Sequence, residues 1–175
     1  MRIDLVPFDE PDTAITDAIR REAATIFGCP VQLRGPLALP AAGYNGERSQ
    51  YLAPALLEGL KAVPRNGWDR LVGLTEADLY TPGLHFVFGQ ASLDLHTAVV
   101  SLCRLRQEYY GLPPDPGLFL DRTVKEVVHE LGHTFGLSHC NDPRCVMHFS
   151  NSLSDTDHKG RFFCHRCRPR MLLQP

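Results

Sequence analysis

The pattern of apolar and polar positions in the first third of the chain predicts two strand-helix units. A short apolar run at 2–8 predicts a strand, and residues 11–27 carry apolar side chains at the spacing of one helix face. After a turn that contains a glycine and a proline, the run at 31–39 predicts a second strand. A second amphipathic helix is expected over 49–62, because its leucines fall on one side.

Three further apolar runs predict strands in the middle of the chain. The run at 68–80 has an apolar centre, the run at 84–91 alternates between apolar and polar residues, and the run at 96–105 is continuously apolar. The last of these also fits the start of a buried helix. Alternation of strands and helices favours an α/β fold.

A long helix is expected after the glycine and proline residues at 111–117, which break the preceding pattern. Thr123 and Glu126 have the spacing of a capping box, and Asp121 is an alternative cap. Gly136 is the expected left-handed end of this helix. The predicted apolar stripe consists of Val124, Val127, Val128, Leu131 and Phe135.

Length and charge narrow the possible classes of protein. The chain has 175 residues, of which 43% are hydrophobic and 22% charged, and this fits one globular domain over 1–175. A formal net charge of −2 argues against binding to nucleic acid or an anionic membrane through the overall field. No run approaches the roughly 20 apolar residues of a membrane span, and the first residues do not resemble a signal peptide. We therefore expect a cytoplasmic protein with neither a membrane nor nucleic acid as its partner.

Residues 129–139 contain the pattern H-E-x-x-H-x-x-G-x-x-H. On a helix, His129 and His133 lie about 40° apart around the axis, so both imidazoles can reach one zinc ion. Glu130 is better placed to hold a zinc-bound water than to bind the metal itself. Gly136 allows a sharp turn that brings back His139 as a third ligand and leaves a fourth position open, which is typical of catalytic zinc sites.

A surface helix with two hydrogen-bonded histidines is the alternative interpretation of the five-residue core of this pattern. The full pattern is far more specific, because a sequence of this composition contains it by chance on the order of once in ten thousand. We therefore interpret residues 129–139 as a catalytic zinc site.

Six cysteines in a reducing compartment are better explained by metal binding, reactivity or burial than by disulfides. Cys29 and Cys103 are isolated, whereas the other four crowd the last quarter of the chain. Two close pairs joined by a loop are typical of a closed zinc site with four thiolates. Because few residues follow Leu137, a structural metal would also help this segment to fold. The expected ligands are Cys140, Cys145, Cys164 and Cys167.

Basic residues surround the cysteine pairs in the sequence and would favour thiolates over thiols. A nucleic-acid patch is the alternative function of these charges, and two pairs of buried thiols are the alternative to a metal site. His165, inside the second pair, is a competing ligand, although we expect it to be an exposed loop residue. The basic residues are Arg144, Lys159, Arg161, Arg166, Arg168 and Arg170.

The motif that begins at His129 resembles the signature of the archaemetzincins. The matching residues are 129–136, His139-Cys140, Cys145-Val146-Met147 and the final cysteine pair. Members of this family are metzincin-type zinc metallopeptidases with a second, structural zinc. The resemblance implies that Met147 is the Met-turn residue beneath the catalytic zinc, where the sequence alone fits an ordinary core methionine.

We therefore expect a metzincin-like α/β fold: a twisted mixed sheet with packed helices, an active-site helix and a small zinc-stapled C-terminal lobe. The upper lobe would span 1–137 and the lower lobe 138–175, with the cleft between them. Two zinc ions are expected in a monomeric chain, one catalytic and one structural. The expected reaction is hydrolysis of a peptide bond in a peptide or protein by a zinc-bound water, with Glu130 as general base and then general acid.

The substrate is expected to bind in extended form along 86–91, in contact with Phe88, Gly89 and Gln90. The alternating pattern, a glycine where backbone must approach closely, and the family resemblance motivate this prediction. An interior strand in which Gly89 only marks a bulge is the alternative.

Two other functions fit the sequence. One is a non-hydrolytic zinc-binding interaction module that uses the basic four-cysteine lobe, and the other is a zinc amide hydrolase that acts on non-peptide substrates. Glu130 favours an enzyme over the module, because a structural site of three histidines needs no general base beside it.

Overall fold

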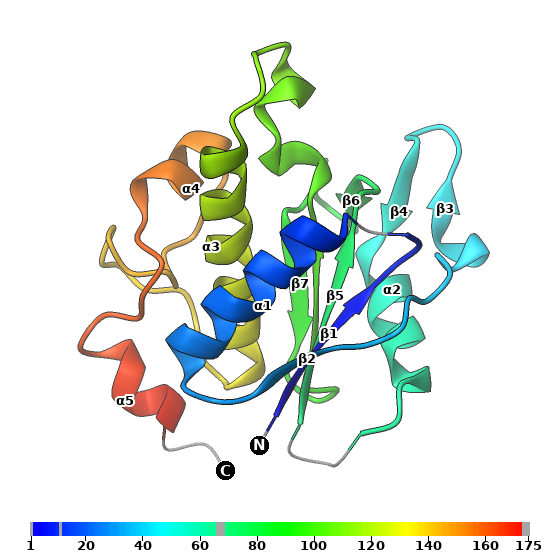
Figure 1. Cartoon of the computed structure of the whole chain (residues 1–175). Helices are drawn as coiled ribbons and strands as arrows, with labels where there is room; N and C mark the ends of the chain where they lie inside the picture. The colour runs from blue at the N-terminus through cyan, green and yellow to red at the C-terminus, as the bar shows by residue number, and fades with distance from the viewer. Residues whose placement is uncertain (1, 11, 66–68, 173–175) are drawn as a thin grey trace.

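In the computed structural model, which describes residues 2–10, 12–65 and 69–172, a five-stranded mixed sheet forms the centre of the protein (Figure 1). The strand order is β2-β1-β5-β8-β7, and β7 alone runs antiparallel to its neighbour. The expected α/β class with a mixed sheet is thereby confirmed. The strands are β1 (Ile3–Pro7), β2 (Val31–Leu33), β5 (Arg70–Thr75), β7 (Gly89–Ser92) and β8 (Thr97–Ser101).

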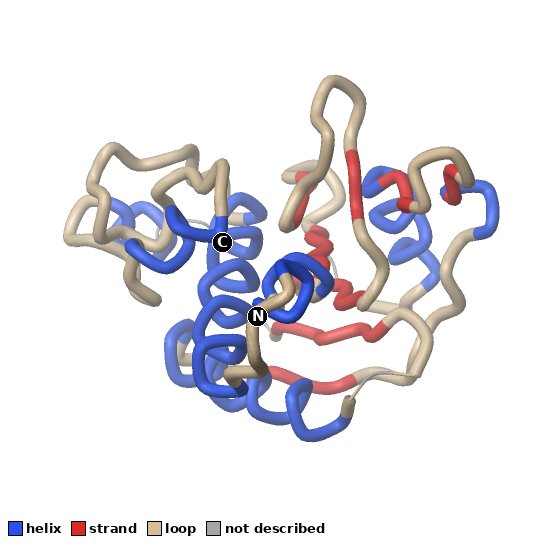
Figure 2. The backbone as a smooth tube through the Cα atoms, turned by 90° about the horizontal axis from the view of Figure 1, so that it is seen from above, coloured by secondary structure: helices blue, strands red, loops and turns tan. Residues whose placement is uncertain are grey.

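Helices cover both faces of this sheet (Figures 1 and 2). On one face α1 (Thr13–Phe27) and α3 (Pro116–Thr134) pack together, and on the other lies α2 (Ala53–Gly59). Side chains alternate along β1, so that Ile3 belongs to the first apolar layer and Val6 to the second. The sheet is therefore buried between two apolar layers.

The protein also contains a three-stranded sheet that the sequence pattern does not predict. Its strands are β3 (Tyr44–Asn45), β4 (Gln50–Leu52) and β6 (Leu79–Tyr80), with β4 in the middle. The prediction of one strand over 68–80 is therefore wrong, because this segment divides between β5 of the large sheet and β6 of the small one. An isolated bridge joins β6 to Val87, just before β7.

The second helix begins later than the prediction over 49–62. The N–H of Tyr51 donates to the carbonyl of Asp78 at 2.9 Å, which draws the first predicted residues into β4. The helix α2 therefore starts at Ala53 and is followed by the short 3₁₀ helix η2 (Leu60–Ala62).

The long helix α3 begins earlier than predicted. The Asp115 carboxylate accepts a backbone N–H three residues later at 2.9 Å, and Pro116 takes the first helical position, where no N–H is needed. The predicted capping box at Thr123 and the alternative cap Asp121 are both wrong, because these residues lie inside the helix. The buried apolar stripe is confirmed, and so is the left-handed Gly136, whose φ is 74°.

Other boundaries differ by a few residues. The strand predicted over 31–39 ends at Leu33. In the rest of this range, only Leu37 forms a β-bridge, an isolated one to Phe8. Within the run at 96–105, the strand β8 covers Thr97–Ser101, as first predicted, and the last three residues form a short 3₁₀ helix. Pro11 and Trp68, at the predicted starts of a helix and a strand, lie outside the described residues. The remaining 3₁₀ helices are η1 (Ala41–Gly43), η3 (Cys103–Leu105) and η4 (Gln107–Tyr110).

Residues 135–172 form a largely irregular segment beside α3 (Figure 1). It contains α4 (Leu153–His158), which contacts α3, and α5 (Cys167–Leu172). Phe163 and Met147 of this segment belong to the same apolar core as the sheet. Among the described residues, no helix combines the length and the apolar character that a membrane crossing requires.

Candidate active site and metal centres

Three histidines converge at the C-terminal end of α3. His129 and His133 are one helical turn apart, and the chain reverses at Gly136 to bring His139 beside them. One nitrogen of each ring lies within 4.8 Å of the others, and the Nε2 atoms of His129 and His133 are 3.1 Å apart. The structure thus brings together the three histidines that the sequence pattern singles out.

Backbone carbonyls fix the orientation of two of these rings. The Nδ1–H of His129 donates to Val146 O at 2.7 Å, and the Nδ1–H of His133 donates to Leu137 O at 2.7 Å. Because a carbonyl only accepts, the proton lies on Nδ1 and the Nε2 lone pair is available to a metal. Burial lowers the pKa of all three histidines, and that of His129 falls well below its usual value, which keeps the rings neutral. This donor set fits a zinc ion.

Glu130 lies against the edge strand β7. Only 6% of the residue is exposed, and a Cβ atom on Gly89 would come within 2.6 Å of the Glu130 Cγ. Gly89 is therefore needed for close approach, as its position in the alternating run predicts. Burial raises the pKa of Glu130 to about 8, the Glu126 carboxylate adds to this increase, and Lys159 opposes it. A carboxyl group with such a pKa can both accept and donate a proton near neutral pH.

Met147 packs against α3 from the C-terminal segment. The residue is fully buried, and its carbonyl accepts the N–H of Cys140 at 2.9 Å. A side chain on Gly132 would collide with the Met147 sulfur, so packing requires this glycine between the two helical histidines. Met147 therefore supports α3 at the point where the motif lies.

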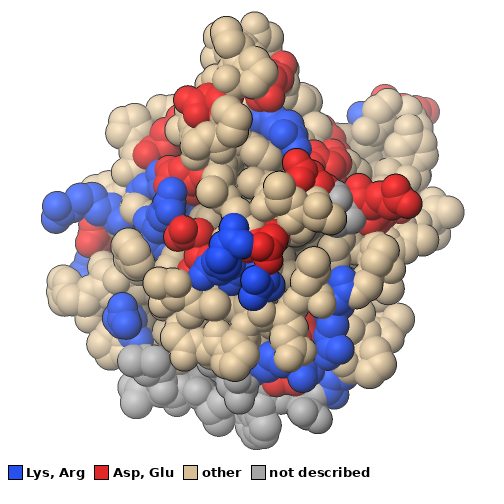
Figure 3. Space-filling model, viewed as in Figure 1, with Lys and Arg blue, Asp and Glu red and all other residues tan. Residues whose placement is uncertain are grey.

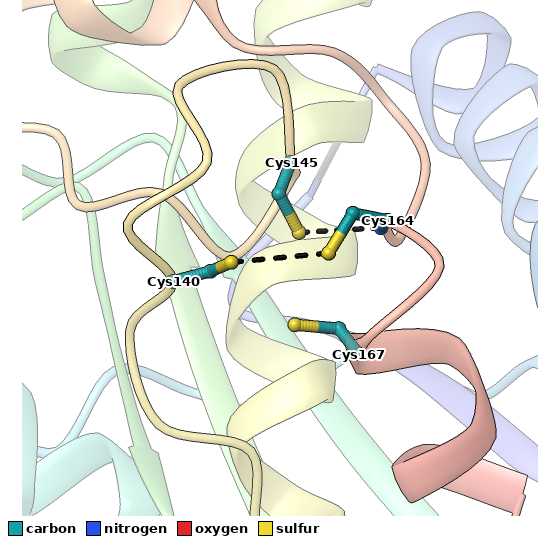
Figure 4. Close-up of side chains that lie close together, drawn as sticks. All are labelled: Cys140, Cys145, Cys164 and Cys167. Carbon is teal, nitrogen blue, oxygen red and sulfur yellow. Dashed lines mark hydrogen bonds between the residues drawn. The ribbon is translucent and has the colours of Figure 1, made fainter.

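The four clustered cysteines point toward one another (Figure 4). Their sulfurs all lie within 4.8 Å, and the Sγ atoms of Cys140 and Cys164 are 3.8 Å apart. Sulfurs at the corners of a tetrahedron around zinc are also separated by about 3.8 Å, since each zinc–sulfur bond is about 2.3 Å. All four cysteines are free of disulfides. The set, which also includes Cys145 and Cys167, fits a closed zinc site.

Backbone N–H groups donate to two sulfurs of this cluster and favour the thiolate of Cys164, whereas burial raises the pKa of Cys145 and Cys167. The N–H of Cys164 donates to Cys145 Sγ at 3.4 Å, and the N–H of Asp142 donates to Cys140 Sγ at 3.5 Å. Against the opposing effect of burial, the backbone N–H groups of Cys167 and Arg166 lower the pKa of Cys164 to about 6.

The prediction that Lys159 and Arg161 favour thiolates at the cysteines is wrong, because both residues pair with carboxylates elsewhere. Lys159 is fully buried and its Nζ lies 3.0 Å from Glu126 Oε1, while Arg161 pairs with Asp121 at 2.5 Å. His165 is exposed and stands outside the sulfur cluster, as expected. On the face shown in Figure 3, acidic and basic side chains are interspersed and form no single basic patch.

A cavity of about 460 Å³ lies beside the three histidines. One wall comes from the segment that leads into β7 and from β7 itself, including Phe88, Gly89 and Gln90. Another wall includes Phe149 and the two residues after it. Glu130 lines the cavity as well, so a group bound there would meet this carboxylate and the histidines together.

The strand β7 forms the edge of the sheet on the cavity side, so the alternative of an interior strand is wrong. The N–H of Ser101 donates to Phe88 O at 2.8 Å, and hydrogen-bonded pairs alternate along an antiparallel ladder. The main chain of Phe88 and Gln90 therefore faces β8. Gly89 and Ala91 present their main-chain groups away from β8, at the free edge. The strand also begins later than the predicted range 86–91, at Gly89, because Val87 is drawn to β6.

The sequence pattern does not predict a buried ion pair between Lys159 and Glu126, which lies beside His129. Lys159 Nζ contacts Glu126 and also lies 3.4 Å from His129 Nδ1, and the Thr156 hydroxyl donates to Glu126 Oε1 at 3.0 Å. Glu126 precedes Glu130 by one helical turn, and this spacing is a signal that could have placed both carboxylates on the cavity side. No sequence signal connects Lys159 to them.

Comparison with known proteins gives a consistent assignment. The profile described as Peptidase family M54 matches residues 31–172. An archaemetzincin from Methanopyrus kandleri is 46% identical over 170 residues, which cover 95% of this chain and 93% of that protein.

Solved structures agree with this result. The crystal structure of the Methanopyrus kandleri archaemetzincin superimposes with a TM-score of 0.86 at 45% identity and covers 98% of this chain and 93% of its own. A zinc-dependent peptidase from Methanocorpusculum labreanum superimposes with a TM-score of 0.88 at 30% identity, over 97% of this chain and 99% of that one. The expected resemblance is confirmed over nearly the whole chain, and it excludes the interpretation as a non-hydrolytic module. The chain belongs to peptidase family M54, the archaemetzincins, and is a zinc metallopeptidase.

Proposed function

We propose that the chain hydrolyses peptide bonds at the three-histidine site, with His129, His133 and His139 as zinc ligands and Glu130 as the group that moves protons. One observation carries this proposal: three neutral imidazoles converge beside a buried carboxylate at the wall of a cavity. A zinc ion there supplies Lewis acidity, which polarises a carbonyl and lowers the pKa of a water molecule.

Glu130 acts twice in the proposed reaction. A carboxylate oxygen first accepts a proton from the water that attacks the scissile carbonyl, and the resulting carboxylic acid then donates this proton to the leaving amine. The pKa of Glu130, about 8, supports both steps, because near neutral pH the group can change between its charged and neutral forms. Phe149, whose ring lies 4.7 Å from that of His139, has no hydroxyl group to donate to a developing oxyanion.

The two lobes would act on opposite sides of the substrate. The cavity is lined both by residues of 1–137 and by residues of 138–175, which supports the proposed division. We also propose a cytoplasmic location, because none of the six cysteines forms a disulfide, as expected in a reducing compartment.

The direct test is digestion of a peptide library by the purified protein, with and without a chelator, followed by mass spectrometry. Cleavage that stops on chelation and returns with added zinc is the expected result. Activity that continues after metal removal would sink the proposal. Cleavage of small non-peptide amides, with the peptides left intact, would favour the amide-hydrolase alternative.

We further propose that the chain binds two zinc ions, one at the histidines and one at the cysteines. The histidines line an open cavity, whereas the four sulfurs close around their centre. A brief chelator treatment should therefore remove one zinc, together with the activity, well before the other. Metal content measured over time checks this result, and simultaneous loss of both ions would contradict two distinct sites.

The edge strand β7 is the proposed binding site for an extended substrate backbone. Ala91→Pro removes one outward N–H donor without breaking the ladder to β8, so the Michaelis constant should rise about tenfold while the protein stays folded. Ala91→Ser keeps the donor and serves as the control. Steady-state kinetics on one quenched peptide compare the two variants, and an unchanged constant in folded Ala91→Pro would reject this binding mode.

A further inference from the structure

We propose that Gln50 is a positioning residue that holds one wall of the substrate cavity and thereby sets a preference for a large apolar side chain in the substrate. The wall is the rim segment, residues 81–88, which connects β6 to β7 and has no regular secondary structure of its own. This inference rests on the proposed use of the cavity for peptide substrates.

The rim segment brings apolar side chains to the cavity. Leu84 and Phe86 line it, and Leu84 is 52% exposed. Phe149, from the C-terminal segment, lines another wall and is 46% exposed. A large apolar side chain bound between these walls would remove their exposed apolar surface from water, which is favourable. A charged side chain would lose hydration against Leu84, Phe86 and Phe149, which offer it no polar group.

The Gln50 side chain holds the rim segment from behind. Gln50 is only 4% exposed, and its Nε2 donates to His85 O at 3.0 Å and to Asp78 Oδ2 at 2.9 Å. Its Oε1 accepts from Arg48 Nε at 2.8 Å, and Arg48 Nη2 donates to the carbonyls of Leu84 and His85 at 3.2 and 2.7 Å. A flipped amide would face oxygen with oxygen, so the network determines the orientation of Gln50.

The same network reaches the aromatic part of the wall. Arg104 donates two hydrogen bonds to Asp78, at 2.8 and 2.7 Å, and its guanidinium lies 4.3 Å from the centre of the Phe86 ring. The Phe86 and Phe88 rings contact each other edge to face, with centroids 5.2 Å apart. Both the backbone and the rings of the rim segment are therefore fixed by polar groups outside the cavity.

A wall held in this way is ordered before substrate arrives. Preorganisation lowers the entropy that binding must overcome, and its loss affects the side chain that contacts the wall more than the rest of the substrate. Gln50 does not line the cavity, so its replacement alters selectivity only through the position of the rim segment.

The test uses two quenched decapeptides of glycine and alanine, one with a single phenylalanine and one with alanine in its place. The parent is expected to cleave the phenylalanine peptide with the higher kcat/KM. Gln50→Leu should reduce this preference about tenfold, mainly through KM, with zinc content and helix content unchanged. Arg48→Ala, an exposed residue whose loss leaves the core intact, should act in the same direction. Arg106→Ala, which removes an arginine that pairs with Glu76, is the matched control and should keep the parental preference.

Binding is measured separately, by fluorescence anisotropy of the same peptides on a Glu130→Ala background. There Gln50→Leu should weaken binding of the phenylalanine peptide and leave the alanine peptide nearly unaffected. A parent without preference, or folded Gln50→Leu and Arg48→Ala variants with the parental preference, would overturn the inference. Failure of the proposed function gives a different result, namely continued cleavage by Glu130→Ala itself.

Discussion

Glu130→Ala is expected to reduce the rate of peptide cleavage by about 10²–10⁴-fold, the contribution of a general base. The metal content should not change, because the three histidines and not Glu130 supply the converging nitrogens. Alanine also leaves the α3 backbone and the contact between Gly132 and Met147 intact. The variant therefore separates proton transfer from metal binding.

The matched control is Glu130→Gln, which keeps the side-chain length that packs on Gly89 but cannot accept the proton. Both variants should be inactive to a similar extent, as measured by initial rates on one quenched peptide. Activity within a few-fold of the parent in either variant would refute the proposed role, and so would loss of zinc in parallel with loss of activity.

Cys164→Ser is expected to lower activity about 10²-fold, although no histidine is changed. The two candidate metal sites share a peptide bond, because His139 belongs to one and Cys140 to the other. The turn that follows also connects them: Cys145 belongs to the sulfur cluster, and the next carbonyl, that of Val146, orients His129. Loss of a thiolate should remove much of a zinc-binding energy of ~10 kcal/mol or more, and a displacement of ~1 Å at a catalytic ligand can cost ~10²-fold in rate.

The expected signature of this coupling is weaker zinc binding at the histidines, with a loss of activity larger than any loss of helix content. Competition with a chromophoric chelator measures the zinc affinity, and circular dichroism measures the helix content. Cys103→Ser, a free thiol outside the cluster, is the control and should behave like the parent. The coupling would be disproved by a Cys164→Ser protein that loses the cysteine-bound zinc but binds the other and turns over substrate normally.

The candidate metal centres could be predicted from the sequence because most of their ligand residues are close together along the chain. His129 and His133 are brought together by a single helical turn, and Gly136 permits the reversal that returns His139. The cysteine pairs are similarly close in sequence, although the contact between Cys140 and Cys164 spans 24 residues. Gly89 was also correctly predicted as a point of close approach, since Glu130 packs where a side chain on residue 89 would lie.

The remaining features depend on contacts between distant residues that no periodicity encodes. The strands of the small sheet are two or three residues long, too short to alternate visibly, and Gln50 reaches His85 across 35 positions. The start of α3 was predicted too late, because Thr123 and Asp121 have the residue types of a cap but lie inside the helix, whereas Asp115 and the proline after it form the actual start. Lys159 was assigned by its nearness in sequence to the cysteines, whereas its charge is balanced by Glu126, 33 residues away.

If the three histidines hold the metal on which peptide cleavage depends, the zinc content of a His133→Ala protein, measured beside the parent, should reveal it. Plasma mass spectrometry gives zinc per chain, and a quenched peptide gives activity on the same samples. Two zinc ions are expected in the parent and one in His133→Ala, with cleavage abolished and the cysteine-bound ion retained. A folded His133→Ala protein that keeps two zinc ions, or one that still cleaves peptides like the parent, would contradict this expectation.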